Sequence, residues 1–131
     1  MRNKLIFALT FILMFTNLYA KDIVIQISDL PATARAFITK HYKENLIRLI
    51  EQDADDKDFE VKLKNKTKID FHPDGVWEKI ESKNKKELPS SIVNLLPKEA
   101  KTYISKMQPK AKVVEIENIH NKKHWEVEVL S

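Results

Sequence analysis

Two histidines are the sharpest chemical feature of the sequence. His120 and His124 flank the three residues 121–123, so their imidazoles could face each other across a hairpin and offer two nitrogens to Zn²⁺ or Cu²⁺. Structural zinc takes four ligands, however, and Lys122 and Lys123 repel a cation. We therefore expect solvated turn histidines here and no bound metal, with a small-ligand or metal carrier using His120 and His124 as the alternative.

An acidic run over residues 51–58 raises the question of calcium. An EF-hand loop needs a glycine at its sixth position and a glutamate at its twelfth, and this run supplies neither at that spacing. The matching segment later in the chain, residues 118–123, is not acidic. The run is therefore expected to be a solvated loop between two strands.

Composition argues against catalysis. The chain has no cysteine and a single glycine, which excludes a thiol nucleophile, disulfides, thiolate metal sites and glycine-rich phosphate loops. No other recognisable catalytic constellation occurs. We expect a protein that is not an enzyme and that needs no cofactor.

The first twenty residues have the pattern of a secretory signal peptide. Arg2 and Lys4 precede an apolar stretch over residues 5–15 that is too short to span a bilayer, and cleavage is expected between Ala20 and Lys21. The remaining chain carries a net charge of about +2, with Lys and Glu interleaved, which does not favour nucleic acid as a partner. We expect an exported protein without a membrane span after cleavage, with the periplasm favoured over the external medium.

The rest of the chain repeats itself with an offset of 66 residues. Leu30-Pro31 matches Leu96-Pro97, and proline is at home in the first turn of a helix. After each Leu-Pro pair, residues at helical spacing form a stripe on one side of the expected helix, and we expect both stripes to lie against a sheet. The stripe residues are Ala34, Phe37, Ile38 and His41 in the first unit, and Ala100, Tyr103, Ile104 and Met107 in the second.

Alternating strands follow each helix. Residues 59–63 alternate apolar and charged side chains and match residues 125–129, while the first unit adds two more strands, on either side of the turn at residues 72–75. Residues 23–27 could form an extra strand or a leader. We predict one α+β domain over residues 21–131, with helices on one face of an antiparallel sheet and one and a half helix-plus-strands repeats, in units of about 28–81 and 88–131.

These motifs resemble the PepSY-like family of small exported bacterial proteins. The resemblance rests on the Leu-Pro helix starts, on Phe59–Leu63 with Ile69–Trp77, and on Lys110–Glu117 with Trp125–Val129. It implies repeats similar to those of beta-lactamase inhibitor protein and, more distantly, to PepSY domains thought to restrain secreted peptidases. Family members usually continue into another pair of strands, and their absence from the second unit leaves an edge strand open.

The resemblance implies binding of another protein without catalysis. If the apolar side chains of the strands point to the helices, their charged neighbours form a mixed-charge outer face that can dock or restrain an exported or envelope protein. We predict that this partner-binding set comprises Glu60, Lys62, Lys64, Lys68, Asp70, Trp77, Glu126 and Glu128. Trp77 could equally well lie in the core, where Trp125 is expected. A homodimer formed through the open edge strand is a further possibility.

Overall fold

The computed structural model describes residues 21–107, 111–119 and 123–130. The expected signal peptide and its cleavage residue Ala20 lie outside the described residues. The elements, in chain order, are β1 (Ile23–Ile25), η1 (Ile27–Asp29), α2 (Ala32–His41), η2 (Glu44–Leu46), β2 (Ile47–Gln52), β3 (Phe59–Leu63), β4 (Thr67–Phe71), β5 (Trp77–Ser82), α3 (Ser90–Val93), α4 (Lys98–Met107), β6 (Lys112–Ile119) and β7 (His124–Leu130).

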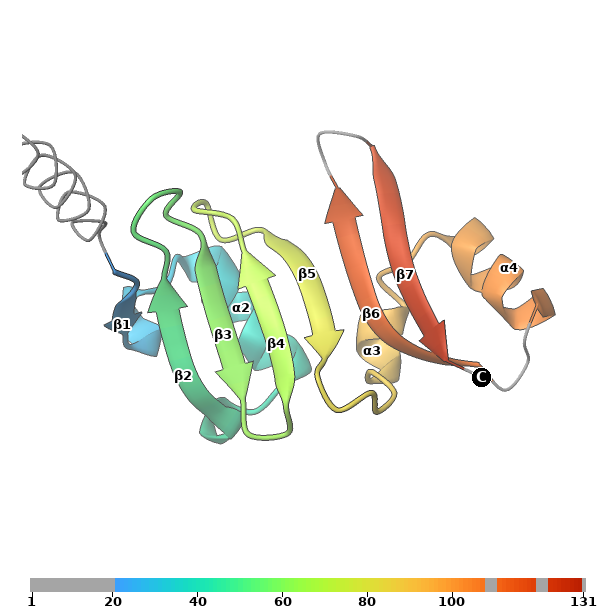
Figure 1. Ribbon diagram of the computed structural model, residues 1–131, viewed down its shortest axis with the longest axis horizontal. Coiled ribbons are helices and arrows are strands. Elements are labelled where there is room, and N and C mark those ends of the chain that lie inside the picture. The colour runs from blue at the N-terminus through green and yellow to red at the C-terminus, as the bar shows by residue number, and fades with distance from the viewer. Residues whose placement is uncertain (1–20, 108–110, 120–122, 131) are drawn as a thin grey trace, which may run out of the picture.

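The seven strands form one antiparallel sheet in simple chain order, from β1 at one edge to β7 at the other. Figure 1 shows α2 and α3 behind this sheet and α4 at its β7 end, so none of the described helices covers the front face. The predicted α+β architecture, with helices on one side of an antiparallel sheet, is confirmed.

The alternative left open for residues 23–27 is also decided. Ile23–Ile25 forms the extra strand β1, which pairs with β2 and places Ile25 opposite Ile50. The chain then turns through η1 toward α2.

The core lies between the sheet and the helices. Along β3 and β4 every second residue is buried, as period-two alternation requires when one face of a sheet is covered. Ile38 of α2 is fully buried together with Val61, Ile69 and Phe71. Partly buried side chains, including Trp77 and Trp125, pack around this cluster.

The internal repeat is visible in the elements themselves. Helix α4 begins and ends 66 residues after α2, and strands β6 and β7 contain the segments equivalent to β2 and β3. Among the described residues, the second unit has no counterpart of β4 and β5.

The helical stripe of the second unit differs from its prediction at one position. Ala100 and Ile104 pack against the core, but Tyr103 is 65% exposed. Its equivalent in α2, Phe37, rests edge-on against Phe71 of β4 and stacks on Trp77 of β5. Within residues 21–107, 111–119 and 123–130, no strand lies beneath Tyr103 as β4 and β5 lie beneath Phe37, which accounts for its exposure.

The glycine of the β4–β5 turn lies against the start of α2. Gly75 has a φ of +89°, and a Cβ placed there would lie 2.8 Å from Cβ of Pro31 and 3.0 Å from the backbone nitrogen of Ala34. We expect Gly75→Ala to lower the free energy of unfolding by about 2 kcal/mol, because both the backbone conformation and the contact become strained. Urea denaturation measures this loss.

Lys66→Ala is the matched control for Gly75→Ala. Lys66 occupies a turn with a φ of 70° and already carries a Cβ, so we expect a change within about 0.5 kcal/mol. Equal losses for the two variants would contradict the close packing of the β4–β5 turn on α2.

Candidate functional site

The face of the sheet opposite the helices carries a lattice of charges at its centre. Lys62 Nζ of β3 lies 3.1 Å from Glu51 Oε1 of β2 and 3.2 Å from Glu60 Oε1. Lys68 Nζ of β4 lies 3.4 Å from Glu60 Oε2 and 3.8 Å from Asp70 Oδ2. Each of these five side chains is at most 35% exposed. Neighbouring charges therefore hold one another in place on a continuous surface, which we call the charged face.

The charged face continues over β5, β6 and β7 with more glutamates than lysines. Three ion pairs join this part, namely Lys79 to Glu115 at 3.2 Å, Lys83 to Glu81 at 3.3 Å and Lys85 to Glu128 at 2.9 Å. Glu117 of β6 lies opposite Glu126 of β7, and Glu115 lies opposite Glu128. Like charges directly opposed are unfavourable, so this end of the sheet favours added positive charge.

The structure brings together most of the predicted partner-binding residues. Glu60, Lys62, Lys68 and Asp70 lie on adjacent strands, with Glu60 directly opposite Asp70 and Lys62 opposite Lys68. Glu126 and Glu128 lie on the same face at the β7 edge, three strands beyond β4. Lys64 lies in the turn after β3, where it is exposed.

Trp77 does not join the charged face. Its ring stacks on Phe37 of α2 with centroids 6.0 Å apart and lies 5.7 Å from the ring of Trp125 on β7. Both tryptophans are partly buried against the core, on the helix side of the sheet. Their contact joins the two repeat units, and this position separates Trp77 from the other residues predicted to bind a partner.

The two-histidine hairpin is only partly described. His120 lies outside the described residues. His124 Nε2 lies 3.5 Å from Glu126 Oε1, and its side chain is 42% exposed. A metal site at His120 and His124 stays a prediction.

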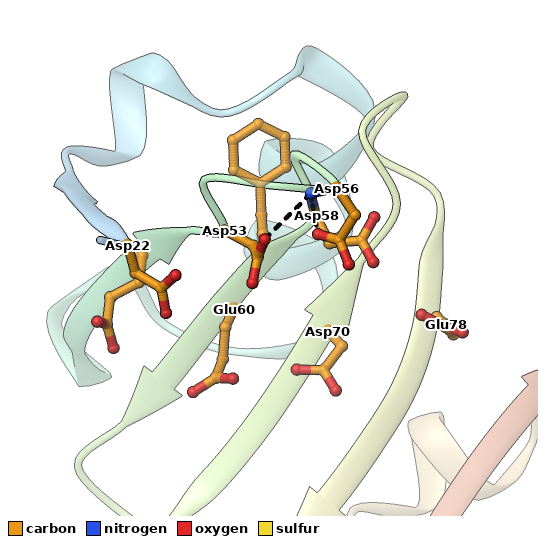
Figure 2. A pocket seen from close by; sticks show the side chains of 9 residues that line it. Asp22, Asp53, Asp56, Asp58, Glu60, Asp70 and Glu78 are labelled. Atoms are coloured by element: carbon orange, nitrogen blue, oxygen red, sulfur yellow. Dashed lines mark hydrogen bonds between the residues drawn. The ribbon is translucent and has the colours of Figure 1, made fainter. Parts of the chain in front are cut away.

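An acidic pocket opens at the end of the sheet where β3 begins and β4 ends. Its volume is about 190 Å³, and Figure 2 shows carboxylates from the β2–β3 loop and from neighbouring strands around it. The carboxylates that line it belong to Asp22, Glu51, Asp53, Asp56, Asp58, Glu60, Asp70 and Glu78.

Local turns fix part of this acidic pocket. Asp53 Oδ1 accepts hydrogen bonds from the backbone N–H groups of Asp55 at 2.8 Å and Asp56 at 3.1 Å. The N–H of Asp56, followed by that of Asp55, lowers the pKa of Asp53. This carboxylate therefore stays ionised and shapes the β2–β3 loop.

Two other carboxyl groups of the pocket are unfavourable as anions. Burial raises the pKa of Asp70 to about 6, and its Oδ1 is buried without a hydrogen-bond partner among the described residues. Burial, together with repulsion from Asp56 and Glu78, also raises the pKa of Asp58. A cation in the pocket would relieve both.

Three possible metal ligands converge at one side of the acidic pocket. Asp58 precedes β3, His72 follows β4, and Glu78 lies in β5; each offers one atom, and the three atoms lie within 4.8 Å of one another. His72 Nδ1 is 4.0 Å from Glu78 Oε2. Carboxylate oxygens are ligands that Ca²⁺ accepts, whereas the imidazole favours transition metals.

Sequence reasoning missed the acidic pocket. It considered residues 51–58 alone and found no calcium loop, whereas the structure adds Asp70 and Glu78 from β4 and β5. The available signal was the alternation of β4, which predicts that Asp70 lies on the same face as Glu60.

Comparison with known proteins agrees with this fold. A family model described as "Putative beta-lactamase-inhibitor-like, PepSY-like" matches the chain twice, over residues 15–68 and 57–131. A search of curated proteins finds no match. No helix among the described residues is long and apolar enough to cross a membrane.

Three solved structures are similar over most of their length. A Bacteroides vulgatus protein named as a "putative periplasmic protein" of the DUF2874 family is 30% identical, with 83% of each chain covered and a TM-score of 0.70. A Bacteroides thetaiotaomicron protein named as a "putative calcium-regulated periplasmic protein" is 31% identical, with 82% of each chain covered and a TM-score of 0.72. A second Bacteroides vulgatus protein, named as a "putative periplasmic protein of unknown function", is 28% identical, with 83% of this chain and 85% of that chain covered and a TM-score of 0.69.

These matches cover both repeat units and agree with the predicted periplasmic location. The chain belongs to the PepSY-like, beta-lactamase-inhibitor-like family of exported periplasmic proteins.

Proposed function

We propose that this protein binds another exported or envelope protein, without catalysis, through the charged face of its sheet. The observation that carries the proposal is that β2, β3 and β4 present an ion-pair lattice on a surface that no described helix covers. A sheet with one face free offers a broad surface whose pattern of charges can select a partner.

The lattice suits recognition because its charges are already held in place. Lys62 and Lys68 are each shared between two carboxylates, so little side-chain freedom remains to be lost when a partner docks. Hydrogen bonds to Glu51 and Glu60 raise the pKa of Lys62, which keeps this ammonium group charged. The charged face therefore supplies shape and charge complementarity for a protein surface.

Affinity capture tests this proposal. The tagged protein is expressed in its native host and recovered from the periplasm together with anything bound to it. We expect the wild type to retain an exported protein at constant stoichiometry and the variant Lys62→Gln/Lys68→Gln to lose it, because both central positive charges are removed.

The control for this capture is Glu44→Gln/Glu87→Gln. Both glutamates are exposed, lie outside the strands and have no ion pair within 4 Å among the described residues, so their removal should leave capture unchanged. Equal capture by wild type and Lys62→Gln/Lys68→Gln would contradict a role for the charged face.

A second candidate function is calcium binding at the acidic pocket. Two observations favour it: several carboxylates converge there, with Asp58 and Asp70 unfavourable as anions, and a relative with 31% identity is named as a putative calcium-regulated periplasmic protein. Affinities of about 10⁻⁴–10⁻³ M are typical of calcium sites in exported modules.

Thermal unfolding with and without CaCl₂ tests the calcium site. At pH 7.5 and 10 mM Ca²⁺ we expect the melting temperature to rise by roughly 5 °C, and by less at pH 5, where protons compete for Asp70. Asp58→Asn/Asp70→Asn should abolish the shift, and Glu44→Gln/Glu87→Gln should keep it. A wild type that does not respond to Ca²⁺ would rule out this second function.

A further inference from the structure

The two repeat units differ in what lies beside their equivalent strands. β3 of the first unit has β2 on one side and β4 on the other. β7, its equivalent in the second unit, pairs with β6 only, so one side of its backbone forms no ladder within the described part of the chain. Such an edge is a template for an added strand.

Burial along these two strands shows what the missing neighbour removes. Phe59, Val61 and Leu63 of β3 are buried. The equivalent residues of β7 are Trp125, Val127 and Val129, and all three are only partly buried although they point to the same side of the sheet. The apolar side chains of β3, which has β4 beside it, are buried, whereas the equivalent side chains of β7 remain partly exposed to solvent.

The helices show the same difference. Ala34 and Ile38 of α2 are fully buried, whereas their equivalents Ala100 and Ile104 of α4 are partly exposed. Phe37 contacts Phe71 of β4 and Trp77 of β5, whereas its equivalent Tyr103 is exposed. Strand and helix therefore share an uncovered apolar margin, which we call the β7 margin.

We propose that the β7 margin receives an extended segment of a partner protein, which adds to the sheet as a strand in the place that β4 occupies in the first unit. The inference rests on the proposed function, because it assumes that the protein binds another polypeptide. The segment alternates apolar side chains, which pack under α4, with basic side chains, which lie on the charged face.

The first unit supplies the pattern for this segment. In β4 the inward residues Ile69 and Phe71 are fully buried under α2, and the outward residue Lys68 lies 3.4 Å from Glu60. Glu126 of β7 occupies the position equivalent to Glu60. A basic residue at the position equivalent to Lys68 would meet it in the same way.

The outward residues of β7 favour a basic neighbouring strand more strongly than the outward residues of β3 do. Glu128 stands where β3 has Lys62, so both outward positions are acidic, and Glu126 has a side chain 61% exposed. Lys85 already pairs with Glu128 and Lys79 with Glu115, but Glu126 lies directly opposite Glu117 of β6, so two carboxylates face each other there. Two basic residues spaced two apart fit this row of glutamates.

The same charges disfavour a second copy of this chain. An antiparallel pairing of β7 with itself that overlaps the whole strand is centred on Val127 and sets each Glu126 against Glu128 of the other copy. Like charges directly opposite destabilise such a pair. The predicted homodimer through an edge strand is thus less well supported than a basic segment from another protein.

Synthetic peptides test the inference on the exported protein. The probe is a capped, fluorescently labelled peptide that copies residues 66–72 and carries Asp70→Lys, so that both outward residues are basic. The matched control peptide carries Lys68→Glu instead, so that both outward residues are acidic. We expect saturable binding of the basic peptide, with NMR shifts confined to β7 and α4, and at least about tenfold weaker binding of the acidic peptide.

Charge reversal on the protein completes the test. Glu126→Lys/Glu128→Lys should reverse the preference and bind the acidic peptide more tightly than the basic one, whereas Glu44→Lys/Glu87→Lys should behave as wild type. The inference would be overturned if both peptides bound equally, if neither bound at millimolar concentration, or if the NMR shifts mapped to other strands. It would also be overturned if the wild type formed a dimer that Glu126→Lys strengthened.

The peptide test and the capture test fail separately. A partner whose capture needs Lys62 and Lys68 but is insensitive to Glu126→Lys/Glu128→Lys would overturn the β7 margin as its site and leave the proposed function standing. Binding of the basic peptide without any captured partner would support the β7 margin as a strand-binding site and overturn the proposed function.

Discussion

Replacing Ile38 with alanine is expected to lower the free energy of unfolding by about 3 kcal/mol, and replacing Ile104 by only about 1 kcal/mol. The two residues occupy equivalent positions of α2 and α4, so helix propensity and the number of deleted atoms are the same. Ile38 is fully buried, however, and Ile104 is partly exposed. Urea denaturation of both variants at pH 7.5 measures the difference.

This pair of substitutions compares α2, which lies over β4 and β5, with α4, for which the described residues contain no equivalent strands. In the first unit β4 and β5 close the core under α2, so the cavity left by Ile38→Ala cannot fill with water without cost. Under α4 the margin is already partly open. Losses of equal size would show that the second unit is as well packed as the first and would remove the physical basis for strand addition at β7.

Replacing Asp70 with asparagine is expected to raise the free energy of unfolding by about 2 kcal/mol at pH 7.5. The folded protein raises the pKa of this carboxyl from 3.8 to about 6, mainly through burial, so the ionised form destabilises the fold above that pH. As pH falls through 6 the folded state binds a proton more readily than the unfolded chain. The contribution of Asp70 to stability therefore improves toward pH 4.

The sign of this pH dependence can be checked directly. Urea denaturation of wild type and Asp70→Asn at pH 7.5 and pH 4.5, without added Ca²⁺, should give a large difference at the higher pH and little or none at the lower. A variant less stable than wild type at pH 7.5 would mean that the contact of Asp70 with Lys68 outweighs burial. Glu44→Gln, on an exposed carboxylate, is the control and should change neither value.

The repeated architecture could be predicted from the sequence because its signals are local. The alternation of residues 59–63 and the Leu-Pro helix starts at residues 30 and 96 depend on near neighbours in the chain. The offset of 66 residues then relates the two units without any knowledge of tertiary contacts. These patterns predicted the helices on one face and the charges on the other.

The remaining features depend on residues that are distant in sequence. Tyr103 follows the same helical pattern as Phe37, but it is exposed, and in the described part of the chain no strand lies where β4 and β5 lie in the first unit. The acidic pocket combines the β2–β3 loop with Asp70 and Glu78 from two other strands. Trp77 is placed by its contacts with Phe37 and Trp125, which belong to different repeats.

The central claim is that the charged face binds another exported protein. The most direct test measures the affinity of the purified captured protein for wild type and for Lys62→Gln/Lys68→Gln by calorimetric titration at 50 and 300 mM salt. We predict at least about tenfold weaker binding by the variant at low salt, and a smaller difference at high salt, because screening weakens contacts between charges. Identical affinities of wild type and variant at both salt concentrations would contradict the claim.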